Sequence, residues 1–265
     1  NGPIFVTNDE GEVAITDWTF NGWGDRFDYD LDNLVPDRIA EQLGLPLFEA
    51  PLVLEAGAVE VNGRGTFLAT RSSIIDLHRN PGISQEEIED ALRQYLGVEH
   101  FIWLTGAGRG VCDLWGDETD CHIDIVARFS DQSTVIYNWT DDTSDPRYEM
   151  LKFSYAELKD AATETGQALD LVPLPLPEVH QTTQMTKWRK NTFTDAAYSN
   201  YLVANQVVLV PVYGHKNDER ALKIIAEHFP GREIIGIEVV GLVEHGGAIG
   251  CVTQPQPAAR KPQGA

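Results

Sequence analysis

The chain has 265 residues, of which 42% are hydrophobic, and this is enough for a sizeable core in one large domain or two small ones. Its formal net charge of −21 argues against a nucleic acid partner, because phosphates must be neutralised by lysine and arginine. The same charge would attract a cationic small molecule, although an acidic composition also serves solubility alone.

The three cysteines, Cys112, Cys121 and Cys251, do not make a disulfide framework, and their number fits a reducing compartment. No apolar run approaches the roughly 20 residues of a membrane span. No secretory signal opens the chain, but its start looks cut, which leaves a lost signal peptide open. We therefore expect a cytoplasmic protein with no membrane partner, and we leave homo-oligomer formation open.

Short apolar segments alternate with helical patterns along the chain. Residues 84–96 show the clearest helix start, because Ser84 is followed three residues later by Glu87. Strands alternating with helices predict an α/β fold, and periodicity alone favours a doubly wound sheet. The expected strands are residues 4–6, 13–15, 53–54, 101–104, 123–129, 133–139, 207–210 and 233–239, and the expected helices are 36–43, 84–96, 155–165 and 218–229.

Two segments are expected to be irregular. Residues 173–191 are rich in Pro, Thr and Gln and are interpreted as an excursion between structural units, or less favourably as a lid. Residues 255–265 contain Pro, Gln, Ala and Gly and are expected to be a disordered tail. Residues 1–254 are then expected to form a single domain.

Two distant segments carry the parts of a covalent cysteine enzyme. Cys251 follows the pair Gly246-Gly247, and His122 and Asp124 stand together far upstream. A thiol, an imidazole and a carboxylate support nucleophilic catalysis. A lone cysteine is more often a small buried apolar residue, and a lone histidine a satisfied core residue. The two glycines that precede Cys251 favour a functional role for its thiol. The His-x-Asp spacing favours a functional role for His122 and Asp124, because residues two apart in an extended segment share one face.

At these residues the chain resembles the agmatine deiminase family, which includes bacterial peptidylarginine deiminases and belongs to the guanidino-group-modifying superfamily. The family's motifs occur in family order along nearly the whole chain. They are Asn1-Gly2-Pro3-Ile4-Phe5-Val6, Asp17 to Gly24, Tyr29-Asp30-Leu31-Asp32, Leu54-Glu55-Ala56-Gly57-Ala58, Arg79-Asn80-Pro81-Gly82, Asp117 to Asp124, Tyr198-Ser199-Asn200-Tyr201, Pro211-Val212-Tyr213-Gly214 and Gly246 to Gln254.

The resemblance implies a β/α propeller of five pseudo-symmetric ββαβ units around a central active site. It also implies an aspartate that binds the substrate guanidinium at the position immediately before Asn1. The chain is therefore expected to lack an N-terminal portion, and expressed alone it is expected to be aggregation-prone and inactive.

The implied reaction is the deimination of a guanidino group without metal or organic cofactor. Cys251 attacks the guanidinium carbon, and His122 acts first as acid and then as base. Glu55 and Asp124 bind the planar cation through paired N–H contacts. The implied substrate is agmatine, converted to N-carbamoylputrescine and ammonia in putrescine biosynthesis. Peptidyl-arginine is the alternative substrate, and a non-catalytic paralogue that binds cationic ligands is the alternative of another class.

Other polar and aromatic residues receive structural interpretations. Glu55 has an alternative as part of an ordinary turn, and Asp117 and Asp120 are interpreted as loop acids. Trp18, Phe20 and Trp23 are interpreted as core residues rather than substrate walls. Cys112, Cys121 and His122 make a poor zinc set, because their spacing is unsuitable and a fourth ligand is not obvious.

Three positions depart from the family pattern. Gly250 stands where members usually have histidine, Cys121 where glycine usually precedes the catalytic histidine, and Ile125 where aspartate is common. Gly250 is expected to add backbone freedom to the loop that carries Cys251. Cys121 adds an oxidisable thiol beside the site.

Overall fold

The computed structural model describes residues 2–177 and 194–258, so the predictions for residues 178–191 and 259–265 lie outside the described residues. The chain forms two compact units. The first comprises Asn1–Ala56, Ile74–Val98 and Gln254–Ala265, and the second comprises Gly57–Ser73 and Glu99–Thr253. The assignment of residues 1–254 to a single catalytic domain stays a prediction.

Four modules of the same topology follow one another along the chain. In each module a first strand pairs antiparallel with a second, a helix follows, and a third strand pairs parallel with the second. The strands are β1 (Ile4–Thr7), β2 (Val13–Thr19) and β3 (Leu47–Val53); β4 (Glu60–Val61), β5 (Thr66–Thr70) and β6 (His100–Leu104); β7 (Ala127–Phe129), β8 (Thr134–Trp139) and β9 (Asp170–Pro175); and β10 (Leu202–Val203), β11 (Val207–Val212) and β12 (Glu233–Glu238). The doubly wound sheet predicted from periodicity is therefore wrong, because three-stranded mixed sheets replace one long parallel sheet.

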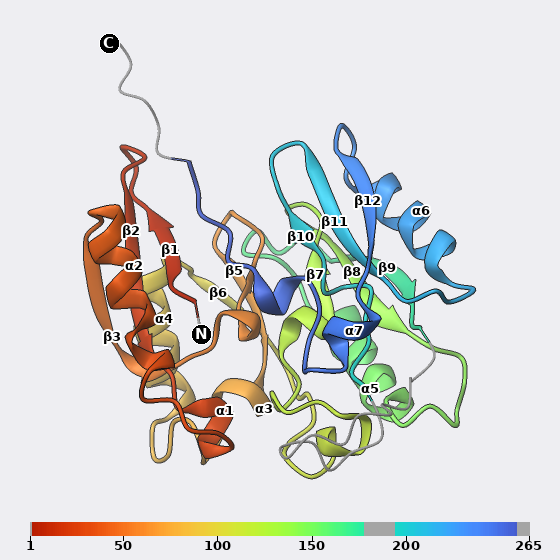
Figure 1. The fold of residues 1–265 in the computed structure, drawn as a ribbon, viewed down its shortest axis with the longest axis horizontal. Coiled ribbons are helices and arrows are strands. Elements are labelled where there is room, and N and C mark those ends of the chain that lie inside the picture. Colours follow the sequence, from red (N-terminus) through yellow and green to blue (C-terminus); the bar gives the residue numbers. More distant parts are fainter. Residues whose placement is uncertain (1, 178–193, 259–265) are drawn as a thin grey trace. The chain divides into compact units, whose positions relative to one another are not determined.

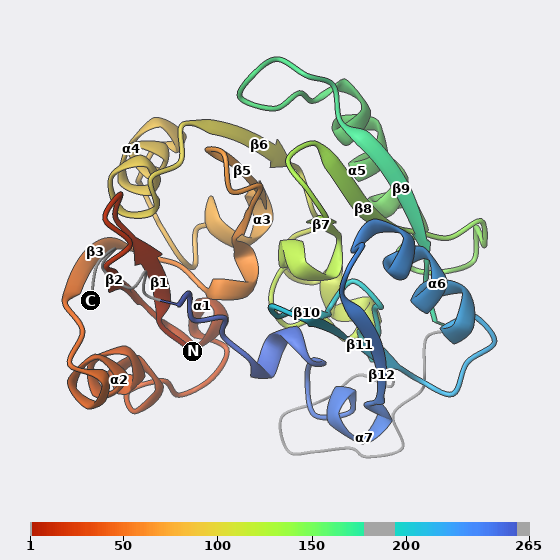
Figure 2. The same ribbon diagram turned by 90° about the horizontal axis from the view of Figure 1, so that it is seen from above.

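Each module has one long helix before its third strand. These are α2 (Val35–Leu43), α4 (Gln85–Leu96), α5 (Tyr148–Asp160) and α6 (Asp218–His228). In the second unit, α5 contacts both β8 of its own module and β6 of the preceding one, and α6 contacts both β12 and β9 (Figure 2). In the first unit, α2 contacts β2, and α4 contacts β3 (Figure 1). Within the second unit, successive modules are thus linked by helices that pack on two sheets.

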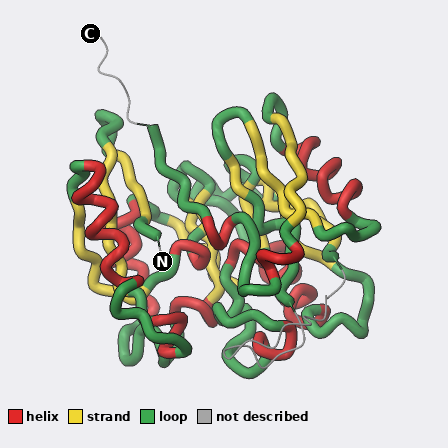
Figure 3. The backbone as a smooth tube through the Cα atoms, viewed as in Figure 1, coloured by secondary structure: helices red, strands yellow, loops and turns green. Residues whose placement is uncertain are grey.

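Three short α-helices lie outside these elements in the described parts of the chain. They are α1 (Gly22–Asp25), α3 (Arg71–Ile74) and α7 (Val240–Val243). In the tube drawing, strands and long helices are separated by extensive loops in the described parts of the chain (Figure 3). Among residues 2–177 and 194–258, no helix combines the length and apolarity needed to cross a bilayer.

Local sequence signals explain the elements that were predicted well. Ser84 accepts a hydrogen bond from the Glu87 backbone, and the Glu87 carboxylate accepts one from the Ser84 backbone, which forms the predicted capping box. Helix α2 ends at Gly44 in the left-handed conformation, at φ 64°. Trp18 and Phe20 are each 2% exposed, as expected of core residues.

Three predicted elements need correction. The strand expected at residues 53–54 is only the end of β3, which begins at Leu47. Residues 123–125 form a 3₁₀ turn (η4, Ile123–Ile125) rather than the start of a strand, and β7 begins only at Ala127. The buried apolar run misled the prediction, because a short run of this kind fits a strand or a buried turn equally well. Helix α5 covers Tyr148–Asp160 rather than residues 155–165, and its buried residues Leu151, Ser154 and Leu158 show helical spacing.

Candidate active site

Cys251 lies in a 3₁₀ turn (η5, Gly250–Val252) of the second unit and is an exposed residue. The preceding Gly246 and Gly247 have φ values of 104° and 128°, which L side chains rarely adopt. A Cβ atom added to Gly247 would lie 2.6 Å from the Cys251 Cβ and 2.8 Å from its Sγ. Glycine is therefore needed at this position, because the backbone passes directly beside the thiol.

Asp124 provides a buried carboxylate next to this thiol. Asp124 is only 6% exposed, and its Oδ2 lies 3.9 Å from the Cys251 Sγ. Asn200 donates a hydrogen bond from Nδ2 to the same Oδ2 at 2.8 Å. The other oxygen, Oδ1, is buried and has no hydrogen-bond partner among the described residues. A carboxylate oxygen of this kind can accept a hydrogen bond from a bound cation.

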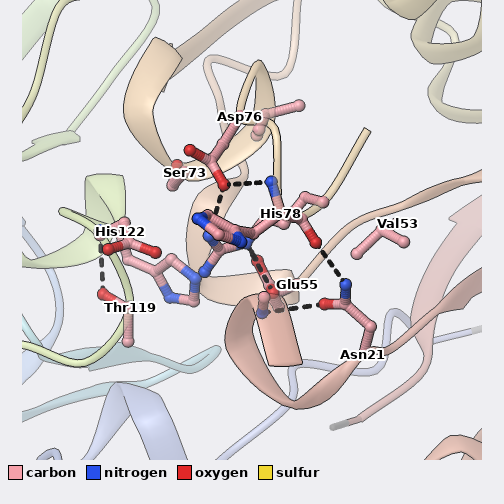
Figure 4. Close-up of polar contacts among 12 residues, drawn as sticks. Asn21, Val53, Glu55, Ser73, Asp76, His78, Thr119 and His122 are labelled. Atoms are coloured by element: carbon pink, nitrogen blue, oxygen red, sulfur yellow. Dashed lines mark hydrogen bonds and ion pairs between the residues drawn. The ribbon is translucent and has the colours of Figure 1, made fainter. Parts of the chain in front are cut away.

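His122 precedes the 3₁₀ turn that holds Asp124. Its backbone N–H donates to the Thr119 Oγ1 at 3.1 Å (Figure 4). The prediction of an extended segment is wrong here, yet both side chains approach the same glycine. A Cβ atom on Gly57 would lie 2.6 Å from the His122 Nδ1 and 3.1 Å from the Asp124 Oδ2. The turn thus brings imidazole and carboxylate together by a route other than strand alternation.

Replacing Gly57 by alanine is expected to reduce kcat strongly. The added methyl group must displace the His122 ring, and misplacing a reacting group by about 1 Å typically costs about 100-fold in rate. Gly241→Ala is the matched control, because a Cβ atom there meets no atom within 4 Å. Steady-state kinetics and melting temperatures of both variants provide the measurement. Wild-type kcat in Gly57→Ala would show that His122 does not need its present position.

Asn200 is the residue that sequence reasoning missed. Besides its contact with Asp124, its Nδ2 lies 3.4 Å from the Cys251 Sγ, and its Oδ1 accepts from the Cys251 backbone N–H at 3.3 Å. The neighbouring Ser199 Oγ donates to the Asp124 carbonyl at 2.9 Å. The motif Tyr198 to Tyr201 contained the signal, because two polar residues that are almost fully buried need specific partners.

Burial and neighbouring charge raise the pKa values of two groups at the site. Burial raises the pKa of Asp124 above its ordinary value, against the lowering effects of His122 and Arg128. Two causes raise the pKa of the Cys251 thiol: loss of hydration, and then the negative charge of Asp124. Because Cys251 is an exposed residue, the negative charge of Asp124 remains an important cause. The raised pKa disfavours the thiolate, and a positive charge that enters the site would favour it again.

The reactivity of Cys251 should therefore increase when Asp124 loses its charge. In Asp124→Asn, the apparent pKa of Cys251 alkylation by iodoacetamide is expected to fall, because removal of a neighbouring anion favours the thiolate. Peptide mass spectrometry across a pH series measures this at Cys251. Cys112 and Cys121, both 0% exposed, serve as internal references that should stay unmodified in the folded protein. An unchanged alkylation profile would contradict the electrostatic coupling.

Glu55 belongs to the first unit, where it forms a buried ion pair. The Arg79 Nε donates to both carboxylate oxygens at 2.8 and 2.9 Å, and the two side chains are 0% and 3% exposed. In the same unit His78 links Asp76 and Asn21 through its backbone N–H and carbonyl oxygen (Figure 4). The role of Glu55 toward a substrate stays a prediction that rests on the family resemblance.

The structure gives physical meaning to two departures from the family pattern. Cys121 has φ 66°, a conformation that glycine adopts more readily than cysteine. A Cβ atom at Gly250 would lie 3.0–3.2 Å from the side-chain amide of Asn200, which is tighter than ordinary contact. Gly250 thus leaves room for the amide that contacts both Asp124 and Cys251.

Comparisons with known proteins agree with the geometry. The model of the Porphyromonas-type peptidyl-arginine deiminases matches residues 1–257. A Lactococcus lactis protein with a provisional agmatine deiminase name is 36% identical over 98% of this chain and 74% of its own length.

Solved structures give the same relationship. The agmatine deiminase of Enterococcus faecalis has a TM-score of 0.90 and 34% identity, covering 98% of this chain and 74% of that one. A substrate-bound cysteine-to-serine variant of C. jejuni agmatine deiminase has a TM-score of 0.81 and 29% identity, covering 94% and 70%. The chain therefore belongs to the guanidino-group-modifying family that unites the agmatine deiminases with the Porphyromonas-type peptidyl-arginine deiminases.

Proposed function

We propose that the protein hydrolyses the guanidino group of agmatine to N-carbamoylputrescine and ammonia through a covalent intermediate on Cys251. The observation that carries the proposal is the exposed thiol 3.9 Å from a buried carboxylate that has one unpaired oxygen. The relatives that are named agmatine deiminases support the choice of substrate. The reaction places the protein in putrescine biosynthesis.

A bound guanidinium would offset the negative charge of Asp124 beside the Cys251 thiol. A guanidinium stays protonated at neutral pH and offers N–H donors in one plane. Asp124 accepts from these donors through the unpaired Oδ1, and Glu55 is proposed as a second acceptor. The bound cation offsets the negative charge that raises the pKa of the Cys251 thiol. Substrate binding thereby favours the thiolate at the moment when it is needed.

In the first half of the reaction the thiol proton of Cys251 passes to His122, and the resulting thiolate attacks the guanidinium carbon. An S–C bond forms, the bond from carbon to one terminal nitrogen breaks, and His122 supplies the proton with which that nitrogen leaves as ammonia. The product of this half is an S-alkylthiouronium on Cys251. Asn200 orients the reacting thiol, because its amide contacts both Sγ and the Asp124 carboxylate.

In the second half His122 takes a proton from water, and the resulting hydroxide attacks the thiouronium carbon. A C–O bond forms, the S–C bond breaks with its electron pair returning to the Cys251 sulfur, and the hydroxyl proton is lost to solvent as the urea C=O bond forms. The product carries a urea group in place of the guanidinium. One imidazole thus serves both halves, as acid and then as base. No step in this sequence requires a metal or organic cofactor.

Peptidyl-arginine is the second candidate substrate, favoured by the name of the matching family model. Ammonia release by the full-length protein with agmatine, free arginine and a peptidyl-arginine decides between them. The proposal expects the highest kcat/KM for agmatine. A preference for peptidyl-arginine assigns the alternative substrate, and no release from any of the three favours a non-catalytic paralogue that binds cations.

For the fold we propose a propeller of five ββαβ units. Four such modules in sequence support it, as do the helices that pack on two successive sheets. A ring of modules would give each helix the same pair of neighbours. The expectations of no nucleic acid partner and no membrane partner remain predictions from composition.

A further inference from the structure

Three potential metal ligands meet in the loop between β6 and β7 of the second unit. Cys112 begins a 3₁₀ turn (η3, Cys112–Trp115), and Cys121 directly precedes His122. The Sγ atoms of Cys112 and Cys121 and a carboxylate oxygen of Asp117 all lie within 4.8 Å of one another. The set of Cys112, Cys121 and His122 was rejected as a zinc site from the sequence, whereas this cluster has Asp117 as its third member.

The cluster is buried in the hydrophobic core of the second unit. Both cysteines are 0% exposed and Asp117 is 2% exposed. Apolar residues of the same core, such as Leu104, Trp115 and Ile123, accompany the two cysteines. Charged groups in such surroundings are costly unless they are paired or coordinate a metal ion. The two thiols must therefore either keep their protons or exchange them for a cation.

The Asp117 carboxylate is held in place by the loop itself. Its Oδ1 accepts from the backbone N–H and the hydroxyl of Thr119 at 2.7 and 2.5 Å, and its Oδ2 accepts from the Cys121 backbone at 2.6 Å. Carboxylates that bind metal ions are commonly oriented by such a second layer of donors. The hydrogen bonds thus fix the carboxylate beside the thiol that follows it in the chain.

The local backbone adds an argument for a specific role of Cys121. Asp120 and Cys121 have φ values of 60° and 66°, a conformation that favours glycine. The peptide groups are held by Thr70 and Ser72, whose hydroxyls donate to the carbonyl oxygens of Cys121 and Asp120 at 2.5 and 2.7 Å. These hydrogen bonds hold the backbone in this conformation, but they involve only main-chain oxygens and would form equally well with glycine at position 121. A metal-ligand role for the sulfur would explain why cysteine occupies a position where the backbone favours glycine.

We propose that Cys112, Cys121 and Asp117 form a binding site for one divalent cation of the zinc class, separate from the catalytic reaction. Thiolates and a carboxylate suit this borderline-soft ion. Ligand atoms around tetrahedral zinc lie about 3.5–4 Å apart, so the cluster needs only small side-chain shifts. Each thiol releases its proton to solvent on binding. The fourth position is taken by water or a backbone oxygen.

The test is a cobalt(II) titration of the full-length Cys251→Ala variant, in which the exposed thiol cannot compete. We expect one cobalt per chain with a thiolate-to-cobalt charge-transfer band, and displacement of cobalt by zinc. The added substitution Cys121→Gly removes one ligand and relieves the left-handed backbone. Zinc should raise the melting temperature of the Cys251→Ala parent. The added Cys121→Gly substitution should lower the cobalt affinity at least tenfold and abolish this rise.

Three outcomes overturn the proposal. One is no charge-transfer band at stoichiometric cobalt. Another is an unchanged band in the Cys121→Gly double variant. The third is a disulfide between Cys112 and Cys121 in freshly purified protein, which assigns a redox pair instead. Because the parent variant lacks the proposed nucleophile, the titration is independent of whether the protein deiminates agmatine.

Discussion

Replacing Cys251 by alanine is expected to abolish ammonia release from agmatine. Removal of the nucleophile eliminates the covalent step, and comparable nucleophile deletions reduce kcat by roughly 10⁴-fold or more. Cys251→Ser should be nearly as inactive, because a hydroxyl in this site has no strong base to activate it. Stability should change by less than about 1 kcal/mol, since the residue is exposed.

The control for this result is Val252→Ala in the same 3₁₀ turn. Val252 is 62% exposed, and its truncation should leave both turnover and melting temperature close to wild type. Activity assays and thermal melts of the three variants measure the two effects separately. Turnover by Cys251→Ala at a rate near wild type would rule out covalent catalysis at this position.

Asp124→Asn should reduce kcat/KM by about 30- to 5,000-fold. Removing one partner from a desolvated charge pair typically costs about 2–5 kcal/mol, and each 1.4 kcal/mol corresponds to tenfold. The substitution preserves shape but leaves the guanidinium without its buried counter-charge. Asp160→Asn at the exposed end of α5 makes the same charge change at a distance from the thiol and should leave the kinetics unaltered.

The Asp124 variant has a second signature, which differs from a folding defect because the buried Cys112 and Cys121 should stay unmodified. Its turnover should fall while its Cys251 alkylation becomes faster at neutral pH, because the same charge binds the substrate and suppresses the thiolate. Normal kinetics with agmatine in Asp124→Asn would contradict the role of this carboxylate. Glu55→Gln should also weaken catalysis, with an effect that additionally reflects the broken ion pair to Arg79.

The sequence predicted those elements whose signals are local. The capping box at Ser84 and the apolar segments at β6, β8 and β11 were recognisable because neighbouring residues determine them. The turn at Ile123–Ile125 was missed, since its apolar residues are equally compatible with a strand. The module topology was implied by the family resemblance and by nothing in the periodicity.

In the candidate site, too, the sequence predicted residues that belong to recognisable motifs and missed residues whose role depends on contacts with distant parts of the chain. The motifs identified Cys251, His122 and Asp124 through residue type and spacing. Asn200 and Gly57 received no role, because their importance depends on contacts with residues about 50 to 75 positions away in the chain. The partnership of Asp117 with the two buried cysteines is likewise visible only after the loop has folded.

The covalent intermediate provides the most direct test of the proposed mechanism. Acid quenching of the wild-type and His122→Ala proteins during reaction with agmatine, followed by intact mass and peptide mapping, should reveal an adduct on Cys251. Its mass should equal that of agmatine minus ammonia, and it should persist longer in His122→Ala, which lacks the base for hydrolysis. Sustained ammonia release from the wild type without an adduct, or with an adduct on any other residue, would contradict the account.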